Sequence, residues 1–326
     1  MVSILIAARN EQDHIIACLK AIAQLSYPAQ QMEVLIGDDQ SEDRTLALIQ
    51  DFIHDKPHFY LYHISEAIDH QRGKTNVLIQ LIRQSKGNYL FFTDADVCVP
   101  THWIQTMLSH LPADTGIVTG VTLIEGPRIF DQLQALDWLY ALTAIQTLSD
   151  WKIPVTAMGN NMAVSRRAYE ATGGYEALPF SLTEDFQLFQ AISKQGFGFQ
   201  NLLMPEVLAV SQPADSLRTL LQQRKRWMRG AMQLPRHMIA LLFAQALFTP
   251  LVIILAFFFP TLALAIFATK AGLQAVFIHR SLRLLKQQML YKYLLIYPLY
   301  EASVSLLLIA YYFLPIPMEW KGRKYN

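Results

Sequence analysis

The sequence predicts an α/β region, in which a mixed, mostly parallel sheet is flanked by helices, followed by a region of membrane helices. Two observations support this division. Up to about residue 215, short apolar runs of strand type alternate with segments of helical spacing. Beyond that point the chain becomes basic and then strongly apolar, with no charged residue from Ile239 to Thr269. At 326 residues the chain is also longer than one soluble core usually requires.

The predicted strands are short apolar runs separated by helical patterns. They are Val2 to Ala7, Glu33 to Ile36, Tyr60 to His63, Tyr89 to Phe92 and Ile117 to Thr119. Apolar residues with helical spacing occur between them, most clearly within 15–22 and 77–82. This alternation favours a mostly parallel sheet covered by helices. We therefore expect ligands at the carboxyl ends of the strands.

Composition excludes several classes of protein. Apolar residues make up 52% of the chain and charged residues 16%, which excludes a disordered chain, collagen and a coiled coil. The net charge of +1 gives no global field that would attract nucleic acid, so no nucleic-acid partner is expected. Cys18 and Cys98 are far apart without CxxC spacing, and we interpret them as core residues rather than a disulfide or thiolate metal site.

Acidic residues follow two of the predicted strands. Asp38 and Asp39 follow the second strand, and Asp94 and Asp96 follow the fourth. An Asp-x-Asp sequence at a strand end offers hard oxygen ligands for Mg²⁺ or Mn²⁺ while the cation keeps positions open for phosphates. The alternative is that both clusters only form turns and helix caps. Each cluster taken alone favours that alternative.

Between these clusters lies Arg72-Gly73-Lys74-Thr75, which resembles the end of a phosphate-binding loop. That loop also needs a glycine five residues before Gly73, where the chain has Ile68, so it is excluded. Lys74 at the start of a helix is expected to contact an anionic ligand instead, because a helix N-terminus carries partial positive charge.

A third acidic segment precedes another helical pattern. Thr183 is expected to cap that helix, which places Glu184 and Asp185 in its first turn. A carboxylate there is stabilised by the helix dipole, and this stabilisation is the alternative to a catalytic role. Further on, residues 217–232 combine leucines with arginine and tryptophan, a pattern typical of a helix on a membrane surface.

The C-terminal part of the chain is expected to enter a membrane. The uncharged stretch from Ile239 to Thr269 would form a helix of about 46 Å, longer than the roughly 30 Å of a hydrocarbon core. Pro260 either kinks one long helix or marks a turn into a second. Tyr293 to Met318 carries only Glu301 and is interpreted as another span, which makes two or three membrane helices.

Charge predicts the orientation of these helices. Basic residues precede and follow the first apolar stretch, and the positive-inside rule places both flanks in the cytoplasm. A hairpin satisfies that rule. No secretory signal precedes the first strand, so the N-terminal region is also expected in the cytoplasm.

In their order, these motifs resemble the family 2 glycosyltransferases. The set comprises Asp-Asp after strand two, Asp-x-Asp after strand four, Thr-Glu-Asp, and Gln-x-x-Arg-Trp just before the membrane helices. The resemblance covers Val2 to Trp227 and is nearest to membrane-bound members similar to ceramide glucosyltransferase and bacterial lipid glycosyltransferases. It implies a GT-A catalytic domain over 1–215, an interfacial helix over 216–238 and a membrane region over 239–326.

The resemblance also implies a reaction and a role for each motif. The reaction is an inverting transfer of a hexose from a UDP-sugar to a hydroxyl of a membrane lipid or lipid-linked acceptor, assisted by Mg²⁺ or Mn²⁺. Asp185 would be the general base and Asp96 the metal ligand. The residues that would bind the nucleotide sugar are Ala8, Arg9, Glu11, Asp38, Asp39, Lys74 and Asp94. The residues that would contact the acceptor or diphosphate are Glu184, Gln223, Arg226 and Trp227.

Elementary chemistry agrees with these roles. Inversion in one displacement needs an acceptor hydroxyl behind the anomeric carbon and a carboxylate that takes its proton. The leaving diphosphate gains charge as the sugar departs, so a cation and an arginine stabilise the transition state more than the ground state. One base and one cation are sufficient.

Two other functions remain open from the sequence. A processive polysaccharide synthase shares the Gln-x-x-Arg-Trp motif, although such enzymes resemble channels with more spans. A non-catalytic membrane subunit is the second, and the presence of both Asp96 and Asp185 disfavours it. Many relatives carry a membrane helix before the first strand, where this chain begins on the strand itself. We expect an integral protein of the cytoplasmic membrane whose catalytic domain faces the cytoplasm.

Overall fold

The computed structural model describes residues 1–326 except 69, 233, 235, 317, 321–322 and 326. Internal contacts divide the chain into two compact units. The first comprises Met1–Leu123 and Ala144–Gln212, and the second comprises Ile124–Thr143 and Pro213–Asn326. The expected domains are consecutive segments, whereas the structure also groups residues 124–143 with the C-terminal part. The boundaries at 215 and 238 stay predictions.

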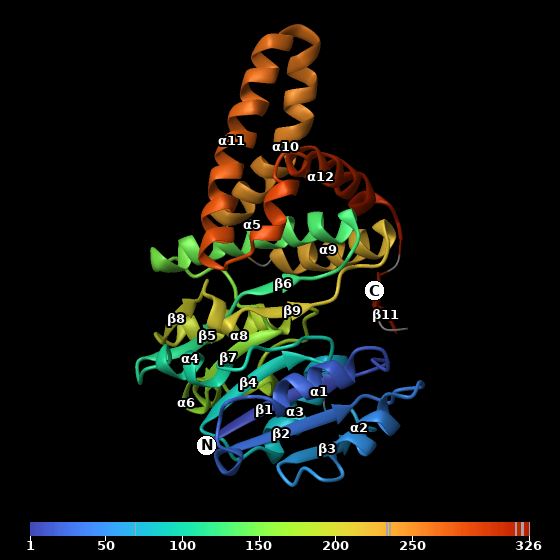
Figure 1. The fold of residues 1–326 in the computed structure, drawn as a ribbon, viewed down its shortest axis with the longest axis vertical. Coiled ribbons are helices and arrows are strands. Elements are labelled where there is room, and N and C mark those ends of the chain that lie inside the picture. The colour runs from blue at the N-terminus through green and yellow to red at the C-terminus, as the bar shows by residue number, and fades with distance from the viewer. Residues whose placement is uncertain (69, 233, 235, 317, 321–322, 326) are drawn as a thin grey trace. The chain divides into compact units, whose positions relative to one another are not determined.

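In the described part of the first unit, seven strands form one sheet. They are β1 (Val2–Ala8), β2 (Met32–Asp38), β3 (Phe59–His63), β4 (Tyr89–Asp94), β5 (Thr115–Thr119), β7 (Asn161–Ser165) and β8 (Gly198–Asn201). Their order is β3-β2-β1-β4-β7-β5-β8 (Figure 1). Only β7 runs antiparallel to its neighbours, so the predicted mixed, mostly parallel sheet is confirmed. All five predicted strands are present.

Four further strands form two small sheets. They are β6 (Thr122–Ile124), β9 (Ala209–Ser211), β10 (Met318–Trp320) and β11 (Arg323–Tyr325). β6 pairs with β9, and β10 pairs with β11. The chain also forms short 3₁₀ segments at η1 (Ala29–Gln31), η2 (Pro205–Val207) and η3 (Gln288–Tyr293).

Helices cover both faces of the seven-stranded sheet. They are α1 (Ile15–Ala23), α2 (Thr45–Ile53), α3 (Gly73–Gln84), α4 (Trp103–Ser109), α6 (Arg166–Ala171), α7 (Gly174–Ala177) and α8 (Glu184–Lys194). Successive side chains of a strand point to opposite faces. Accordingly, Ile4 belongs to the core cluster that includes Ile15 of α1, and Leu5 to the cluster that includes Val77 of α3. Burial on both faces is why these strands are almost continuously apolar.

The pairing of β1 fixes where the motif loops lie. Ala8 pairs with Asp38 on β2, and Ala7 pairs with Asp94 on β4. Three parallel strands therefore end at one edge of the sheet, and the loops that follow them start side by side. The sheet thus brings together the first two acidic clusters, as expected from the sequence.

The two cysteines differ in burial. Cys18 is fully buried in the core, as expected, and its thiol donates to the main-chain carbonyl of Asp94 at 3.5 Å. Burial raises the pKa of the Cys18 thiol well above its ordinary value. Cys98 is only partly buried, and its main chain bridges to Val210.

The second unit is helical. Its helices are α9 (Leu217–Ala231), α10 (Arg236–Phe258), α11 (Pro260–Leu284), α12 (Tyr297–Phe313) and the first part of α5 (Ile129–Asp150). Among the described residues, Met238–Phe258 and Pro260–Leu284 form the helices long and apolar enough to cross a membrane. Pro260 starts α11, so it marks a turn rather than a kink. Within the expected span of Tyr293 to Met318, α12 has 17 residues, and the count of two or three membrane helices stays a prediction.

Charged groups join the helices of this unit. The guanidinium of Arg224 on α9 lies 2.6 Å from the Asp137 carboxylate on α5, and Tyr297 on α12 donates to the same carboxylate at 3.2 Å. Lys225 is buried and donates to the main-chain carbonyl of Leu314, just beyond the end of α12, at 2.8 Å. Two basic residues of the predicted membrane-surface helix therefore make contacts inside the protein.

Replacing Asp137 tests this packing. The Asp137→Ala variant leaves the Arg224 guanidinium, whose side chain is 15% exposed, without its carboxylate partner. Breaking a buried pair on one side costs about 3 kcal/mol, so we expect the free energy of unfolding to fall by that amount. Chemical denaturation in detergent measures it. As a control, Asp114→Ala removes an exposed carboxylate and should change stability by less than about 0.5 kcal/mol. Equal stability of both variants would contradict the prediction.

Candidate active site

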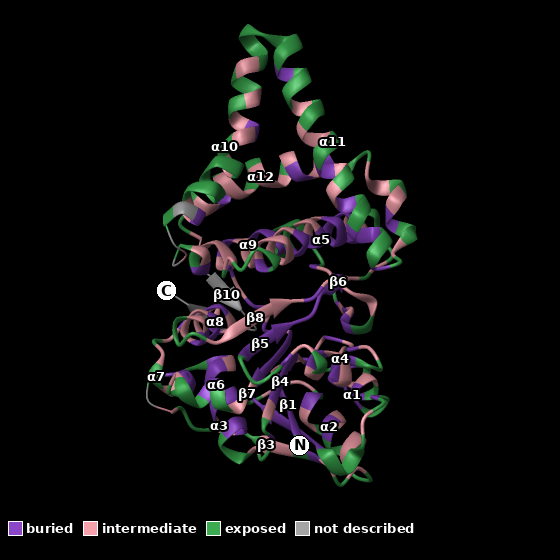
Figure 2. Cartoon of the chain, turned by 90° about the vertical axis from the view of Figure 1, so that its left-hand side faces the viewer, coloured by how far each residue is buried: buried purple, intermediate pink, exposed green. Residues whose placement is uncertain are grey.

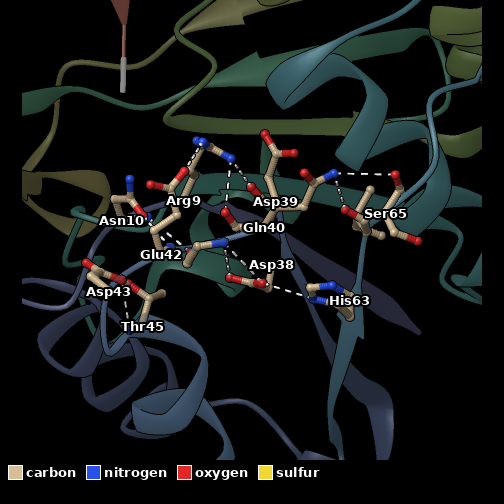
Figure 3. A network of polar contacts seen from close by, with 12 residues as sticks. Arg9, Asn10, Asp38, Asp39, Gln40, Glu42, Asp43, Thr45, His63 and Ser65 are labelled. Carbon is tan, nitrogen blue, oxygen red and sulfur yellow. Dashed lines mark hydrogen bonds and ion pairs between the residues drawn. The ribbon is translucent and has the colours of Figure 1, made fainter. Parts of the chain in front are cut away.

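The two carboxylates after β2 have different surroundings. Asp38 is completely buried, lies 3.1 Å from Nδ1 of His63 and accepts the main-chain N–H of Ser41 at 3.4 Å. Figure 3 shows the Asp39 carboxylate pointing away from Asp38 and His63, on the same side as the Arg9 guanidinium. Asp38 therefore stabilises the loop. Asp39 is also buried, at 7% exposure, and its carboxylate lies on the same side of the loop as the Arg9 guanidinium.

Arg9 connects the loop after β1 to the loop after β2 through hydrogen bonds and an ion pair. Its guanidinium donates to the main-chain carbonyls of Asp39 at 2.6 Å and Gln40 at 3.1 Å, and lies 3.1 Å from the Glu42 carboxylate (Figure 3). Gln40 has a φ of +56°, a left-handed conformation that is unusual for a residue other than glycine. The Arg9 hydrogen bonds on either side of it hold the loop in this conformation.

Glu11 and Ala8 complete this edge of the sheet. Glu11 is buried, and its main-chain N–H donates to the Thr45 hydroxyl at 2.7 Å. The carbonyl of Ala8 accepts the N–H of Asp39 at 2.8 Å. The structure therefore brings together Ala8, Arg9, Glu11, Asp38 and Asp39 at one edge of the sheet, and their role in nucleotide binding stays a prediction.

Asp94 ends β4, and Asp96 lies in the turn that follows, where the N–H of Val97 donates to the carbonyl of Asp94 at 3.1 Å. The side chains of Asp94 and Asp96 are partly exposed, whereas Ala95 and Val97 are buried. The hydroxyl of Ser211 donates to Asp96 at 3.4 Å.

Lys74 joins three elements of this unit. It is the second residue of α3, and its amine lies 2.6 Å from Asp94 on β4 and 3.0 Å from Glu184 on α8. Partial burial opposes its charge, but Asp94, Glu184 and Asp185 together raise the pKa of the Lys74 amine above its ordinary value. The sequence predicts an anionic contact for Lys74, and in the structure the anions are these carboxylates of the protein.

Asp185 is the second residue of α8. Thr183 stands at the N-cap as expected, although its side chain makes no capping hydrogen bond. The carboxylate of Asp185 accepts the main-chain N–H of Gly159 and that of Phe186, each at 2.8 Å. Burial raises the pKa of Asp185 to about 6 and the charge of Glu184 adds to this, while Lys74 and the two N–H donors oppose it.

A carboxylate with this pKa is suited to general-base catalysis. At neutral pH it is ionised, yet it binds a proton more readily than an ordinary aspartate. The two N–H donors fix its orientation. Asp185 can therefore accept a proton from a hydroxyl placed next to it.

Gly159 allows this arrangement because it has no side chain. A Cβ at position 159 would lie 2.8 Å from the Cβ of Asp185, closer than such atoms approach in proteins. The role of Gly159 in holding the candidate base was missed.

Asn161 is a second residue whose role the sequence did not show. Its side chain is fully buried, accepts the indole N–H of Trp103 at 2.8 Å, and donates to the carbonyls of Val121 and Val207 at 2.9 Å. Each of these partners lies at least 40 residues away along the chain. Asn161 thus fixes the start of β7, two residues after Gly159.

The acidic side chains of the first unit suit a cation that receives most of its ligands from a substrate. The described residues contain no group of three or more His, Cys, Asp or Glu side chains arranged to hold a metal ion. Asp94 pairs with Lys74, and the assignment of Asp96 as the metal ligand stays a prediction. Carboxylate oxygens and phosphate oxygens together match the preference of Mg²⁺ and Mn²⁺.

Gln223, Arg226 and Trp227 all lie on α9, in the second unit. The Trp227 ring packs against Trp138 with centroids 4.6 Å apart, and the Arg224 guanidinium lies 4.5 Å from the Trp227 ring centre. Trp227 therefore contributes to the packing of α9 on α5. The roles assigned to these three residues stay predictions.

Comparison with known proteins gives a consistent result. The chain is 27% identical over 241 residues to a probable glycosyltransferase, YdaM, of Bacillus subtilis, covering 70% of this chain and 54% of that protein. It is 26% identical over 239 residues to a beta-monoglucosyldiacylglycerol synthase of Synechocystis, covering 71% and 48%. It is 24% identical over 234 residues to a poly-beta-1,6-N-acetyl-D-glucosamine synthase of Staphylococcus epidermidis, covering 70% and 54%. The chain spans about half the length of these relatives.

A solved structure shows the same fold. A mannosyltransferase from Pyrobaculum calidifontis, in complex with GDP-mannose and Mn²⁺, matches with a TM-score of 0.54 and 21% identity, over 94% of this chain and 86% of that one. This match and the sheet described above confirm the GT-A fold. The sequence profile of glycosyl transferase family 21 matches residues 1–326 in full. The chain therefore belongs to glycosyl transferase family 21 and is a glycosyltransferase.

Proposed function

We propose that this enzyme transfers one hexose from a UDP-sugar to a hydroxyl of a membrane lipid, with inversion at the anomeric carbon. The observation that carries the proposal is the Asp185 carboxylate. It is oriented by two N–H groups, has its pKa raised to about 6, and belongs to the same charged cluster as Asp94. A base poised near neutral pH is what a single displacement by a hydroxyl requires.

The proposed reaction needs one proton acceptor. The acceptor hydroxyl attacks the anomeric carbon as its proton passes to a carboxylate oxygen of Asp185. The new bond joins the acceptor oxygen to the sugar, and the bond from the sugar to the diphosphate breaks. UDP leaves with the electron pair of that bond. Because attack and departure occur on opposite faces, the configuration inverts.

The loops after β1, β2 and β4 would hold the donor. Asp38 and Asp39, in the loop that Arg9 holds, are assigned to the uracil and ribose end, and Asp94 is assigned to the nucleotide. Asp96 would hold Mg²⁺ or Mn²⁺, which supplies positive charge to the leaving diphosphate when bound. Lys74 balances the carboxylates around it and would share its charge with the donor phosphates.

The lipid acceptor is proposed from the relatives and the apolar helices. A beta-monoglucosyldiacylglycerol synthase is among the relatives, and α10 and α11 have the length and hydropathy of membrane helices. Gln223, Arg226 and Trp227 on α9, and Glu184, keep the assignment to the acceptor or diphosphate that the family resemblance implies. A polysaccharide synthase is also among the relatives, so extension of a polymer is the second candidate.

Transfer by the purified full-length chain tests the proposal. In detergent with a diacylglycerol acceptor, we expect one UDP-hexose of a panel to yield a one-sugar glycolipid of β configuration from an α-linked donor. The reaction should stop on addition of a chelator and resume with Mg²⁺ or Mn²⁺. Asp185→Asn should lower kcat by about 10²- to 10⁴-fold, because it removes the proton acceptor.

The matched control for this variant is Asp114→Asn, which changes an exposed carboxylate and should keep full activity. Calorimetry should show that Asp185→Asn still binds UDP. A long polymer on a sizing gel would favour the synthase alternative. Unchanged turnover of Asp185→Asn would rule out the assignment of the base.

The raised pKa of Asp185 predicts a pH dependence. Below about pH 6 the carboxyl is protonated and cannot accept a proton, so kcat/KM should fall about tenfold per pH unit. Above pH 6 it should reach a plateau, since Lys74 keeps its charge there. Initial rates from pH 4.5 to 8 measure the profile, and circular dichroism at each pH confirms folding. A rate independent of pH over that range would contradict the prediction.

Gly159→Ala tests whether the absence of a side chain at position 159 is needed to hold Asp185 in place. The added methyl group would meet the Cβ of Asp185 and displace it, and a misplacement of this kind lowers kcat by up to about 10²-fold. We expect the inflection of the pH profile to move as well, because the N–H of residue 159 no longer reaches the carboxylate. Gly272→Ala, where a Cβ meets no atom within 4 Å, is the control. Equal kcat values in the two variants would refute this role of Gly159.

A further inference from the structure

A pocket with two cationic side chains lies where α11 ends. It has a volume of about 440 Å³, and it is formed by the end of α11, the turn that follows and η3. Sites for small molecules usually measure about 300–1,000 Å³. The residues that line the pocket are Leu282, Arg283, Lys286, Gln288 and Tyr291. All of these side chains except that of Leu282 can donate hydrogen bonds, so the pocket suits an anionic ligand with several acceptor oxygens.

No carboxylate of the protein pairs with these two charges. Within the residues that the structure describes, neither the Arg283 guanidinium nor the Lys286 amine forms an ion pair. The sequence explains this, because no Asp or Glu occurs from residue 216 to residue 300. Lys270 in the same stretch is paired with Glu301, the first acidic residue beyond it. The charges that line the pocket are therefore available to an anion from outside the protein.

Buried leucines and a tyrosine hold the pocket in shape. Leu282, Leu285 and Leu290 are buried, so the turn between α11 and η3 is packed against the protein. The Tyr291 hydroxyl donates to the main-chain carbonyl of His279 on α11 at 3.5 Å, and the centres of the two rings lie 5.2 Å apart. These contacts fix η3 against the end of α11. The residues that line the pocket are thus held in place without a ligand.

Lys286 occupies a position where glycine is usual. Its φ is +58°, and its N–H donates to the carbonyl of Arg283 at 3.3 Å, while the N–H of Gln287 donates to that of Leu282 at 2.9 Å. This pattern ends many helices, and glycine adopts the left-handed conformation with less strain than lysine. The helix dipole also favours a cation here, but Arg280 and Arg283 already supply that charge. A ligand of the pocket explains why a lysine stands at this position.

The surroundings of the pocket indicate the headgroup region of a membrane. α10 and α11 have the length and hydropathy of membrane helices, and Figure 2 shows most of both as exposed or intermediate. Met289 in η3 and Leu295 just after it are 74% and 90% exposed. Exposed apolar residues next to lysine and arginine are typical of a segment between acyl chains and headgroups. Because charges are costly in hydrocarbon, Arg283 and Lys286 are expected among headgroups, whether or not α10 and α11 cross the membrane.

We infer that this pocket binds the phosphate group of an anionic phospholipid. The planar guanidinium of Arg283 is suited to two phosphate oxygens at once, and the Lys286 amine adds a second positive charge. Gln288 and Tyr291 offer neutral donors, and Met289 provides an exposed apolar contact for the acyl chains. The inference rests on the membrane association in the proposed function and goes beyond it, because this lipid is a bound ligand and not the acceptor of the sugar.

Selective retention of an anionic lipid tests the inference. The purified full-length chain in detergent is mixed with phosphatidic acid or phosphatidylcholine, and native mass spectrometry measures the fraction of protein that carries one lipid. Neither probe has an alcohol hydroxyl that could accept a sugar, so binding as an acceptor does not contribute. We expect about tenfold more retention of phosphatidic acid, because choline carries a positive charge next to its phosphate. Equal retention of the two lipids would overturn the inference.

Two double variants separate the pocket from general surface charge. Arg283→Gln with Lys286→Gln should lower retention of phosphatidic acid about tenfold, because charge-assisted hydrogen bonds are lost. The matched control, Arg280→Gln with Lys292→Gln, removes the same charge from exposed residues that do not line the pocket. Since solvent screens such charges, the control should lower retention less than about threefold. Equal losses in the two variants would refute the pocket as a binding site.

Lys286→Gly separates binding from folding. Glycine adopts the left-handed conformation more readily, so the unfolding temperature in lipid-free detergent should rise. Loss of one cation should at the same time lower retention of phosphatidic acid about fivefold. A lower unfolding temperature or unchanged retention would contradict the role of Lys286.

Inorganic phosphate distinguishes a lipid site from a site for free phosphate. At millimolar concentration it should leave the retention of phosphatidic acid unchanged, because it lacks the apolar contacts of the acyl chains. Displacement of the lipid would overturn the assignment of the ligand. None of these measurements requires sugar transfer. An inactive protein that retains phosphatidic acid selectively would contradict only the proposed function, and an active protein without this selectivity only the present inference.

Discussion

The ammonium group of Lys74 is the contact on which the charged side of the first unit depends. It joins Asp94 at the end of β4 to Glu184 at the start of α8, and Asp185 adds to the negative charge around it. Without this cation, three carboxylates would repel one another in a partly buried place. The pKa of Asp185 reflects the balance. Burial and Glu184 raise it, and Lys74 keeps it from rising further. A donor diphosphate would compete with these carboxylates for the same amine, so donor binding and the basicity of Asp185 are electrostatically linked.

The sequence predicted those parts of the fold that follow from local pattern. Val2 to Ala7 and Tyr89 to Phe92 are apolar because both faces of the sheet are covered, and the acidic residues after them stand where such strands leave the core. The strand β7 was not predicted, because its apolar segment, 162–164, is too short to show the alternation typical of a strand. Its place between β4 and β5 depends on long-range pairing. Within the span expected over Tyr293 to Met318, α12 covers only Tyr297–Phe313, because composition alone does not show where a helix begins and ends.

The sequence suggests members of the candidate site, but it does not show the contacts between them. Carboxylates at strand ends and at a helix start indicated Asp39, Asp96 and Asp185. That Lys74 pairs with Asp94 and Glu184, residues 20 and 110 positions away, has no local signal in the chain. The same holds for Gly159, because only three-dimensional proximity shows that a methyl group there would collide with Asp185. Gln223, Arg226 and Trp227 keep the roles that the family resemblance implies, and their test is biochemical.

The buried Cys18 has a practical consequence for work with this enzyme. Its thiol donates to the main chain of Asp94 and, because burial raises its pKa, it stays protonated at neutral pH. The thiolate is the species that reacts with oxidants and electrophiles. The Cys18 thiol next to the acidic loop is therefore unreactive. Air oxidation during purification should leave the structure around Asp94 unchanged.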